Sequence, residues 1–376
     1  MMTVSKANQN KPHVALISPF PPPNGGIANW SLLVKQQLDR EKYPYQIINI
    51  APKSRFTDGR GLFQRITDGF ATTFGAITSL NKLYSCNQVE VIHLCTSGSL
   101  AFLRDFFIAK WAESHKVPIA YHLHFGRVPE ILVGQSWEKE LLKRVLKSVD
   151  IVIVLDGKTE DSLKSFDSSV RVTRIGNPVD CSYLRTLSRE DSPDRRIEYV
   201  GWIIKEKGIF ELIEAWKCVH SRYPNWILEL VGPYNENDDL YQHIKSLPKE
   251  VVLCGELDHD AAMKRLSSSA ALVLPSHTEA FPNVILEAMA LSKPVIATDV
   301  GAITEMVPED SGIVIPVSNA SALADAMISL IEDDIARRRM GANGNALVKQ
   351  KFDLTRVVNS YEACWTSLCF AERDAR

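Results

Sequence analysis

The chain has 376 residues, of which 45% are hydrophobic and 23% are charged, and its formal net charge at pH 7 is -2. This length suits two domains better than one core, and the composition excludes a disordered or fibrous chain. The charge gives no overall basic surplus, so nucleic-acid binding is not expected. Seven cysteines without a CxxC pair indicate neither a disulfide framework nor a zinc site.

The amino-terminal segment 1–11 is polar and lacks the apolar core of a secretion signal. No apolar run in the sequence reaches the ~20 residues that are needed to cross a bilayer. We therefore expect a cytoplasmic protein whose contact with a membrane, if it has one, is peripheral.

Short apolar runs alternate with helical stretches along most of the chain, which is typical of βαβ units that build parallel sheets. In the first half, the expected strands are 14–18, 46–50, 89–94, 119–123 and 151–155. In the second half, they are 196–200, 226–231, 251–254, 271–274, 294–298 and 312–315.

A boundary is expected near Pro178, where Gly176 and Asn177 also favour a turn. The prediction is an α/β protein with two Rossmann-like, doubly wound domains, 1–178 and 179–353. The last helical stretch begins near Leu354 and is expected to cross back, so that 354–376 join the first domain.

The most informative segment follows the expected strand 271–274. Glu279 lies in the loop after this strand, and Glu287 lies inside the next helix. Free amides at a helix N-terminus favour anions, so the loop and first turn could face a diphosphate while the two carboxylates accept hydrogen bonds from sugar hydroxyls. The residues of that first turn are Phe281, Pro282, Asn283 and Val284.

This segment strongly resembles the retaining glycosyltransferases of the GT-B fold, family 4, whose hallmark is Glu, seven residues, then Glu. The resemblance implies two facing domains with a nucleotide-sugar site in the cleft between them. It also implies that Glu279 contacts the donor sugar and that Glu287 contacts the ribose. Without this resemblance, Glu279 would be interpreted as a negative charge near a helix N-terminus and Glu287 as an exposed helical glutamate.

A second match follows the strand 196–200. In the family this turn supplies an Arg and a Lys that neutralise the diphosphate; the Lys aligns with Lys207, whereas Trp202 holds the Arg position. Loss of a bidentate cation removes one source of stabilisation for the leaving group. Lys205 could compensate, or Trp202 could stack on a ligand ring; simple packing of Trp202 at the domain face is the alternative.

Two strand ends carry Gly232 and Gly255, which resemble loops that line the nucleotide in the family. Absence of a side chain allows close backbone approach, although either glycine could serve only its turn. After the opening strand, Gly25 and Gly26 resemble the family's Gly-rich loop, which approaches the donor with backbone amides.

His122 and His124 share one face at the end of the strand 119–123. The outer residue, His124, aligns with a family histidine that contacts the donor sugar, and a core histidine is the alternative for both. His122 and Arg127 are candidates for acceptor contact. Lys139, Lys143, Arg144 and Lys147 form a basic helical face that could meet anionic headgroups, or could simply be solvated.

The resemblance implies transfer of a sugar, with retention, from a UDP- or GDP-sugar to a glycan or lipid-linked acceptor in polysaccharide synthesis. His124, Lys207 and Glu279 are the predicted catalytic residues. No DxD-like motif or His/Cys cluster stands out, so no metal or other cofactor is expected. An epimerase or hydrolase of nucleotide sugars and a non-catalytic binding subunit remain the alternatives. The base, the sugar, the acceptor and the oligomeric state stay open.

Overall fold

The computed structural model describes residues 11–23, 25–51, 62–187, 195–237, 239–245 and 251–374. The chain divides into two compact units, one formed by Met1–Pro178 with Leu354–Arg376 and the other by Val179–Asp353. These are the bounds that the sequence analysis predicts. The second sheet begins and ends within one continuous stretch of chain, whereas the first unit is completed by the distant C-terminal segment.

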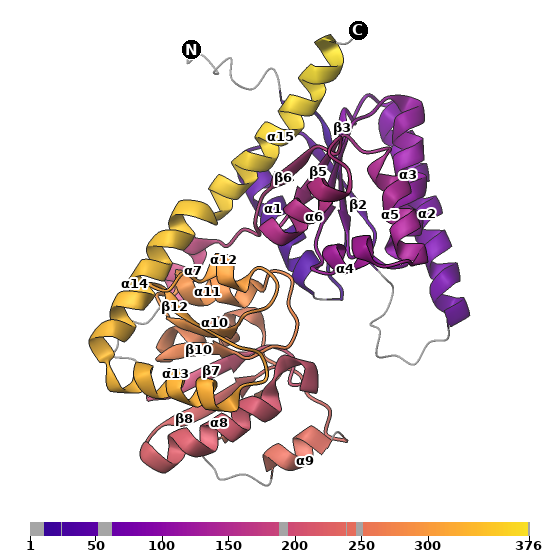
Figure 1. Ribbon diagram of the computed structural model, residues 1–376. Helices are drawn as coiled ribbons and strands as arrows, with labels where there is room; N and C mark the ends of the chain where they lie inside the picture. Colours follow the sequence, from indigo (N-terminus) through magenta and orange to yellow (C-terminus); the bar gives the residue numbers. More distant parts are fainter. Residues whose placement is uncertain are drawn as a thin grey trace, which may run out of the picture. The chain divides into compact units, whose positions relative to one another are not determined.

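The first unit contains a parallel sheet of six strands in the order β2-β1-β3-β4-β5-β6 (Figure 1). Its strands are β1 (Val14–Ser18), β2 (Tyr45–Asn49), β3 (Val91–Thr96), β4 (Ile119–Leu123), β5 (Ile151–Val154) and β6 (Val172–Arg174). Its helices are α1 (Gly26–Arg40), α2 (Leu62–Ser85), α3 (Ala101–His115), α4 (Val128–Val133), α5 (Trp137–Leu146), α6 (Gly157–Phe166) and α15 (Leu354–Asp374).

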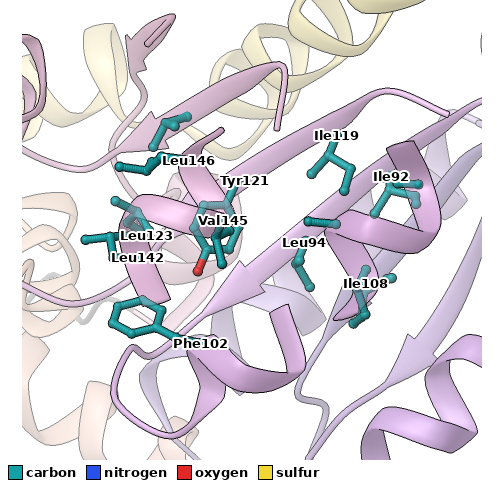
Figure 2. Close-up of a cluster of buried hydrophobic side chains, with 14 of the residues drawn as sticks. Ile92, Leu94, Phe102, Ile108, Ile119, Tyr121, Leu123, Leu142, Val145 and Leu146 are labelled. Carbon is teal, nitrogen blue, oxygen red and sulfur yellow. The ribbon is translucent and has the colours of Figure 1, made fainter. Parts of the chain in front are cut away.

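Both faces of the first sheet are buried, because successive side chains along each strand enter opposite clusters. Ile92, Leu94 and Tyr121 pack against helices such as α3 and α5, as Figure 2 shows. On the same strands, the apolar side chains that point the opposite way belong to the second cluster, which also contains side chains of α1 and α15. This double burial explains why the strands are nearly continuous apolar runs, and why those runs can be read from the sequence.

Helix α15 closes the second face of this sheet, as predicted. Its Tyr361 hydroxyl accepts a hydrogen bond from Nε1 of Trp30 at 3.1 Å, and Nε1 of its Trp365 donates to Nδ1 of His93 at 3.0 Å. All four of these side chains are fully buried. The C-terminal helix is therefore part of the core of the first unit.

The second unit contains a parallel sheet of six strands in the order β12-β11-β10-β7-β8-β9. Its strands are β7 (Arg196–Val200), β8 (Ile227–Val231), β9 (Val251–Gly255), β10 (Ala271–Leu274), β11 (Val295–Thr298) and β12 (Gly312–Ile315). Its helices are α7 (Cys181–Leu187), η2 (Lys205–Lys207, a 3-10 turn), α8 (Ile209–Arg222), α9 (Asp239–Lys245), α10 (His259–Ser268), α11 (Asn283–Ala290), α12 (Ile303–Met306), α13 (Ala320–Glu332) and α14 (Asp334–Lys351).

The predicted strands are all present, with ends that shift by no more than two residues. Strand β6 was not predicted, because it has only three residues and its side chains are not fully buried. It is recognised only by its parallel pairing with β5, from Val152↔Val172 to Val154↔Arg174. A short edge strand carries too little apolar pattern to be identified from sequence.

One buried carboxyl group stands out in the second sheet. Glu198 on β7 is 0% exposed and pairs in register with Glu229 on β8. Arg196 and Arg265 both bond to Glu229, whereas neither carboxyl oxygen of Glu198 has a hydrogen-bond partner among the described residues. Burial is the main cause that raises the pKa of Glu198 to about 8, so the protonated form predominates near neutral pH.

We predict that Glu198→Gln stabilises the second unit increasingly as pH rises. The folded carboxyl holds its proton up to about pH 8, whereas the unfolded carboxyl loses it near 4.5, so wild-type stability falls between these values. The variant and wild type should be similar at pH 4.5 and differ by at least about 1 kcal/mol at pH 8. Denaturant unfolding across this range measures the difference, and parallel pH curves would contradict the prediction.

Candidate active site

Lys207 and Glu279, the two residues predicted to hold the donor, meet in the second unit. They come from the loops after β7 and β10, which are neighbouring strands of its sheet. Nζ of Lys207 lies 2.6 Å from Oε1 of Glu279, and the Ser276 hydroxyl donates to the same oxygen at 2.8 Å. Both charged side chains are mostly buried. The sheet thus delivers a cation and a carboxylate to one point at its C-terminal edge.

The close approach of these two loops depends on Gly208. Its φ of +69° lies in the left-handed region, and a Cβ there would lie 2.0 Å from the carbonyl oxygen of Pro275. Main-chain contact adds a second link, since the amide of His277 donates to the carbonyl of Glu206 at 3.0 Å. The backbone therefore fixes where Lys207 stands relative to Glu279 before any ligand arrives.

The helix that follows Glu279 begins one residue later than predicted. Pro282 was expected inside the first turn, but its ψ of 112° is extended and it is the N-cap of α11. Phe281 and Pro282 are buried, and the Phe281 ring packs against Phe352. Asn283 and Val284, the first helical residues, are half-buried. The first helical turn thus begins at Asn283, on a segment anchored by Phe281.

Glu287, the second predicted acid, has a partner that the sequence analysis missed. Nε2 of His259 lies 2.8 Å from Oε1 of Glu287. His259 opens α10, directly after the N-cap Asp258, and Asp260 lies near its other ring nitrogen at 3.9 Å. The bond to Glu287 is the main cause that raises the pKa of His259 above its usual value. In the sequence, the one feature that could have drawn attention to His259 is its position just after the loop that follows β9.

A hollow of about 460 Å³ lies beside this pair. It is lined by Asp258, His259, Asp260, Ala261 and Lys264. A volume of this order is within the range of small-molecule sites. The space opens at the start of α10, next to the histidine that holds Glu287.

Trp202 and Lys205 both lie exposed in the loop after β7. The hydroxyl of Tyr199 donates to the carbonyl of Trp202 at 2.7 Å, which fixes the backbone at this point. The Trp202 side chain is 43% exposed, so its indole has a face that a ligand can reach. The roles predicted for Trp202 and Lys205 stay predictions.

The two predicted nucleotide-loop glycines differ in why they are glycines. A Cβ on Gly232 would lie 1.8 Å from the carbonyl oxygen of Gly201, so the packing of the chain itself requires this glycine. Gly255 has φ +72° but its Cβ would meet no described atom within 4 Å. Gly232 therefore allows two loops to pack closely, whereas Gly255 is favoured by its left-handed backbone and leaves open space where a side chain would begin.

In the first unit, Gly25 is the N-cap of α1 and Gly26 is its first residue. Gly25 has an extended backbone that any residue adopts, and a Cβ on either glycine would meet no described atom within 4 Å. Packing within the described chain thus gives no reason for these glycines. A reason outside the chain, such as close approach of a ligand, remains the prediction.

His122 belongs to the core, which corrects its predicted contact with an acceptor. It is 0% exposed, and its Nδ1 lies 3.2 Å from Nε2 of His93. Because the indole of Trp365 can only donate, Nδ1 of His93 accepts, and the hydrogen bonds assign the proton of neutral His93 to Nε2. His93 then donates to His122. Burial lowers the pKa of His93 to about 3, consistent with a neutral ring.

His93, Cys95 and His122 bring potential metal-ligand atoms within 4.8 Å of one another. All three side chains are buried, and the ring nitrogens of His93 are already used by Trp365 and His122. These bonds explain the cluster as core structure without an ion. Among the described residues, no other group of this kind is present.

His124 differs from His122 because it is only half-buried and lies just beyond the end of β4. Its ring lies 3.8 Å from that of His122 and 5.0 Å from that of Trp30, centroid to centroid. Nε2 is buried and makes no hydrogen bond to a described atom. Burial lowers the pKa of His124 to about 3, so the ring is neutral at physiological pH. A neutral ring with a spare nitrogen can exchange a hydrogen bond with a hydroxyl.

Arg127, the other predicted acceptor residue, is exposed at the end of the loop after β4. One guanidinium nitrogen donates to the hydroxyl of Ser99 at 3.0 Å and lies 3.5 Å from the carboxylate of Glu138. The Ser99 hydroxyl also donates to Glu138 at 2.6 Å. These contacts hold Arg127 over the turn that precedes α3, with part of its charge already balanced.

We predict that His259 titrates above the usual histidine range and that Glu287→Gln removes the shift. The carboxylate of Glu287 stabilises the imidazolium, so the folded pKa of His259 exceeds 6.5 in the wild type. A titration of the histidine ring protons by NMR measures this value. Glu256→Gln, in the nearby loop, is the matched control and should leave the titration unchanged; an unshifted wild-type His259 would contradict the prediction.

Three comparisons place this geometry among known proteins. Residues 185–347 match the family described as glycosyl transferases group 1. The capsular polysaccharide biosynthesis glycosyltransferase CapM of Staphylococcus aureus is 34% identical over 161 residues, which are 42% of this chain and 42% of CapM. The alpha-D-kanosaminyltransferase of Streptomyces kanamyceticus is 28% identical over 252 residues, 66% of this chain and 61% of that protein. The chain thus spans about three fifths or less of these curated relatives.

The sucrose-phosphate synthase of Thermosynechococcus elongatus has the same fold. Its structure superposes with a TM-score of 0.75 at 21% identity and covers 95% of this chain and 99% of that one. The fold class is therefore GT-B, as the resemblance implied. The match in sequence covers the very segment that contains Lys207, Glu279 and Glu287. Through residues 185–347, somewhat less than half of its length, this chain is similar to the glycosyl transferases group 1 family.

Proposed function

We propose that the protein is a retaining glycosyltransferase that moves a sugar from a nucleoside diphosphate sugar to a glycan or lipid-linked acceptor in polysaccharide synthesis. The observation that carries the proposal is the contact between Lys207 and Glu279 at the C-terminal edge of the second sheet. Ligands of open parallel sheets bind at this edge. The match to the glycosyl transferases group 1 family and the similarity to CapM support transfer of a sugar.

The charges of the site suit the parts of such a donor. Lys207 offers a cation to the diphosphate, and the amides that begin at Asn283 offer hydrogen bonds to its oxygens. Glu279 accepts from hydroxyls of the sugar. Glu287 gives one oxygen to His259 and keeps the other for the ribose. The proposed site therefore combines a positive group with two acceptors of hydroxyl protons.

In the proposed reaction, the bond between the anomeric carbon and the phosphate oxygen breaks while the acceptor oxygen bonds to that carbon on the same face. The acceptor's proton passes to the departing phosphate oxygen. Lys207 and the helix amides stabilise the charge that develops there, and this electrostatic term can supply much of the rate. No residue is needed as a covalent nucleophile, and no metal or other cofactor is part of this proposal.

The first unit supplies further groups to the proposed site. His124 has a buried, unpartnered nitrogen that could meet a sugar hydroxyl, and Gly25 and Gly26 begin α1 without a packing reason for glycine. Arg127 is available for an anionic acceptor. We also propose a cytoplasmic location with peripheral contact to a membrane. Among the described residues, no helix is long and apolar enough to cross a bilayer.

The alternatives differ in what happens to the donor. A nucleotide-sugar epimerase or hydrolase would consume the donor quickly without an acceptor. A non-catalytic binding subunit would bind the donor and turn over nothing, a reading favoured only by Trp202 at the usual Arg position. Both alternatives share the donor site, so binding alone does not distinguish them from a transferase.

We predict that the wild type binds one nucleoside diphosphate and its sugar conjugate selectively. The variant Glu279→Gln should lower the affinity for the sugar conjugate far more than the affinity for the nucleotide. The reason is that Glu279 accepts from the sugar, not from the diphosphate. Thermal shift and calorimetry with UDP, GDP and ADP, with and without sugars, measure this selectivity. Turnover with a glycan acceptor should fall roughly a hundredfold in the variant and be unaffected by a chelator.

Glu206→Gln is the matched control for this experiment, because Glu206 is an exposed carboxylate in the same loop as Lys207. It should leave binding and turnover within about twofold of wild type. Donor loss without acceptor would support the epimerase, and binding with no turnover would support the subunit. If Glu279→Gln leaves the affinity for every conjugate unchanged, the proposed site is wrong.

We also predict that Trp202→Arg tightens binding of the nucleoside diphosphate, by about tenfold. An exposed guanidinium in this loop can bond two phosphate oxygens at once, which the indole cannot do. Trp202→Ala separates the two roles predicted for the indole, because affinity falls if the ring stacks on the ligand and is unchanged if it only packs on the domain. Calorimetry with the preferred nucleotide measures both variants; weaker binding by Trp202→Arg would show that the indole itself is needed.

A further inference from the structure

The first unit exposes a group of large apolar side chains on two neighbouring helices. Phe74 and Phe70 on α2 are 74% and 53% exposed. Leu103 and Phe107 on α3, with Leu100 just before it, are also exposed. These five residues are called the apolar patch below. Exposed apolar groups of this extent usually mark an interaction surface.

The sequence of α2 adds to this signal. From Gly69 to Asn81 the helix contains no charged residue, although several of its side chains face solvent. A solvent-facing helix normally carries charged residues on its outer face. The outer face of this helix instead presents Phe70, Phe74 and the short polar side chains of Thr67 and Thr78. Such a helix face can be buried away from water without the cost of desolvating charged groups.

The apolar patch does not form a pocket large enough for a small-molecule ligand. The groove between α2 and α3, lined by Gly69, Thr73 and Arg104 together with patch residues, holds only about 60 Å³. Small-molecule sites are several times larger. Phe74, the most exposed member, projects outside this groove and is not among its lining residues. Protruding aromatic rings are suited to insertion into an apolar environment outside the protein.

A basic surface lies beside the patch. Helix α3 lies between α2 and α5 on one side of the first sheet (Figure 1). Lys143 and Arg144 on α5 and Lys147, which caps this helix, are exposed, with Glu140 as the exposed acid of α5. Trp137 at the start of α5 is half-exposed, and Val133 at the end of α4 is almost fully exposed. Apolar and cationic side chains thus share one layer of helices.

From this arrangement we infer that the layer formed by α2, α3 and α5 docks onto an anionic lipid surface. The rings of Phe70 and Phe74 enter the interfacial region, and the cations of α5 contact headgroup phosphates. Two signals are combined here, since neither the aromatic rings nor three cations alone hold a protein firmly on a bilayer. The inference adds a surface to the proposed function but does not use the donor site.

Vesicle binding by the full-length chain tests this inference. The wild type should bind vesicles of phosphatidylcholine with phosphatidylglycerol at least tenfold more tightly than phosphatidylcholine alone, and added salt should weaken the binding. The double variant Phe70→Ser, Phe74→Ser should lose about tenfold or more of the partition coefficient. Replacing Lys143, Arg144 and Lys147 with Gln should remove the preference for anionic vesicles and most of the salt dependence.

Ile335→Ser is the matched control, because Ile335 is 80% exposed on α14 in the other unit. It should bind vesicles like the wild type. Thermal unfolding should show that all variants fold, and nucleotide binding, measured in parallel without vesicles, should be unchanged in each. A variant that loses vesicle binding but keeps nucleotide binding therefore has a defect in this surface. A variant that loses nucleotide binding but keeps vesicle binding has a defect in the donor site.

Three results would overturn the inference. The first is a wild type that does not bind anionic vesicles, and the second is a Phe70/Phe74 variant that binds them as well as Ile335→Ser does. The third result is a wild type that self-associates through the patch, seen as a dimer in sedimentation that the double variant dissociates, with no vesicle binding. In that case the patch covers a second copy of the chain.

Discussion

The candidate site depends on one ion pair, between Lys207 and Glu279, and on the backbone that holds it. The two loops meet because their strands, β7 and β10, are neighbours in the sheet and because Gly208 lets the chain pass close to Pro275. Any larger residue there would collide with a carbonyl oxygen. Ser276 adds a hydrogen bond to the same carboxylate oxygen, so its position is set from two directions. Such fixed charges are what electrostatic catalysis requires.

The same principle applies to the second acid. Glu287 is held by His259, and His259 is itself placed by the start of α10 after its Asp258 cap. A carboxylate that already has one oxygen engaged presents the other in a fixed direction. The two acids are therefore held by different partners, Glu279 by a lysine and Glu287 by a histidine whose pKa the bond to Glu287 raises.

The first unit uses its polar groups differently. Its histidines and indoles form a buried set in which Trp365 donates to His93 and Trp30 donates to Tyr361. These bonds tie α15 to a sheet formed some three hundred residues earlier in the chain, and they satisfy groups that would be costly to bury alone. Nε2 of His122 and Nε2 of His124 have no hydrogen-bond partner among the described residues. Of these two histidines, His124 is the one that is only half-buried, at the end of β4, so its ring is the better placed to meet a hydroxyl.

The sequence by itself determined the two sheets, the boundary at Pro178 and the return of the last helix, because strands buried on both faces appear as apolar runs and the loops after them carry Gly, Pro and charged residues. The resemblance of two local motifs to a known family also indicated Lys207, Glu279 and Glu287 as candidate site residues. Only the tertiary structure decided that β6 pairs with β5, that His259 holds Glu287, that His122 is buried and that Phe74 is exposed. Each of these depends on which distant segment, or which solvent, lies next to a residue, and periodicity along the chain carries no record of that neighbour.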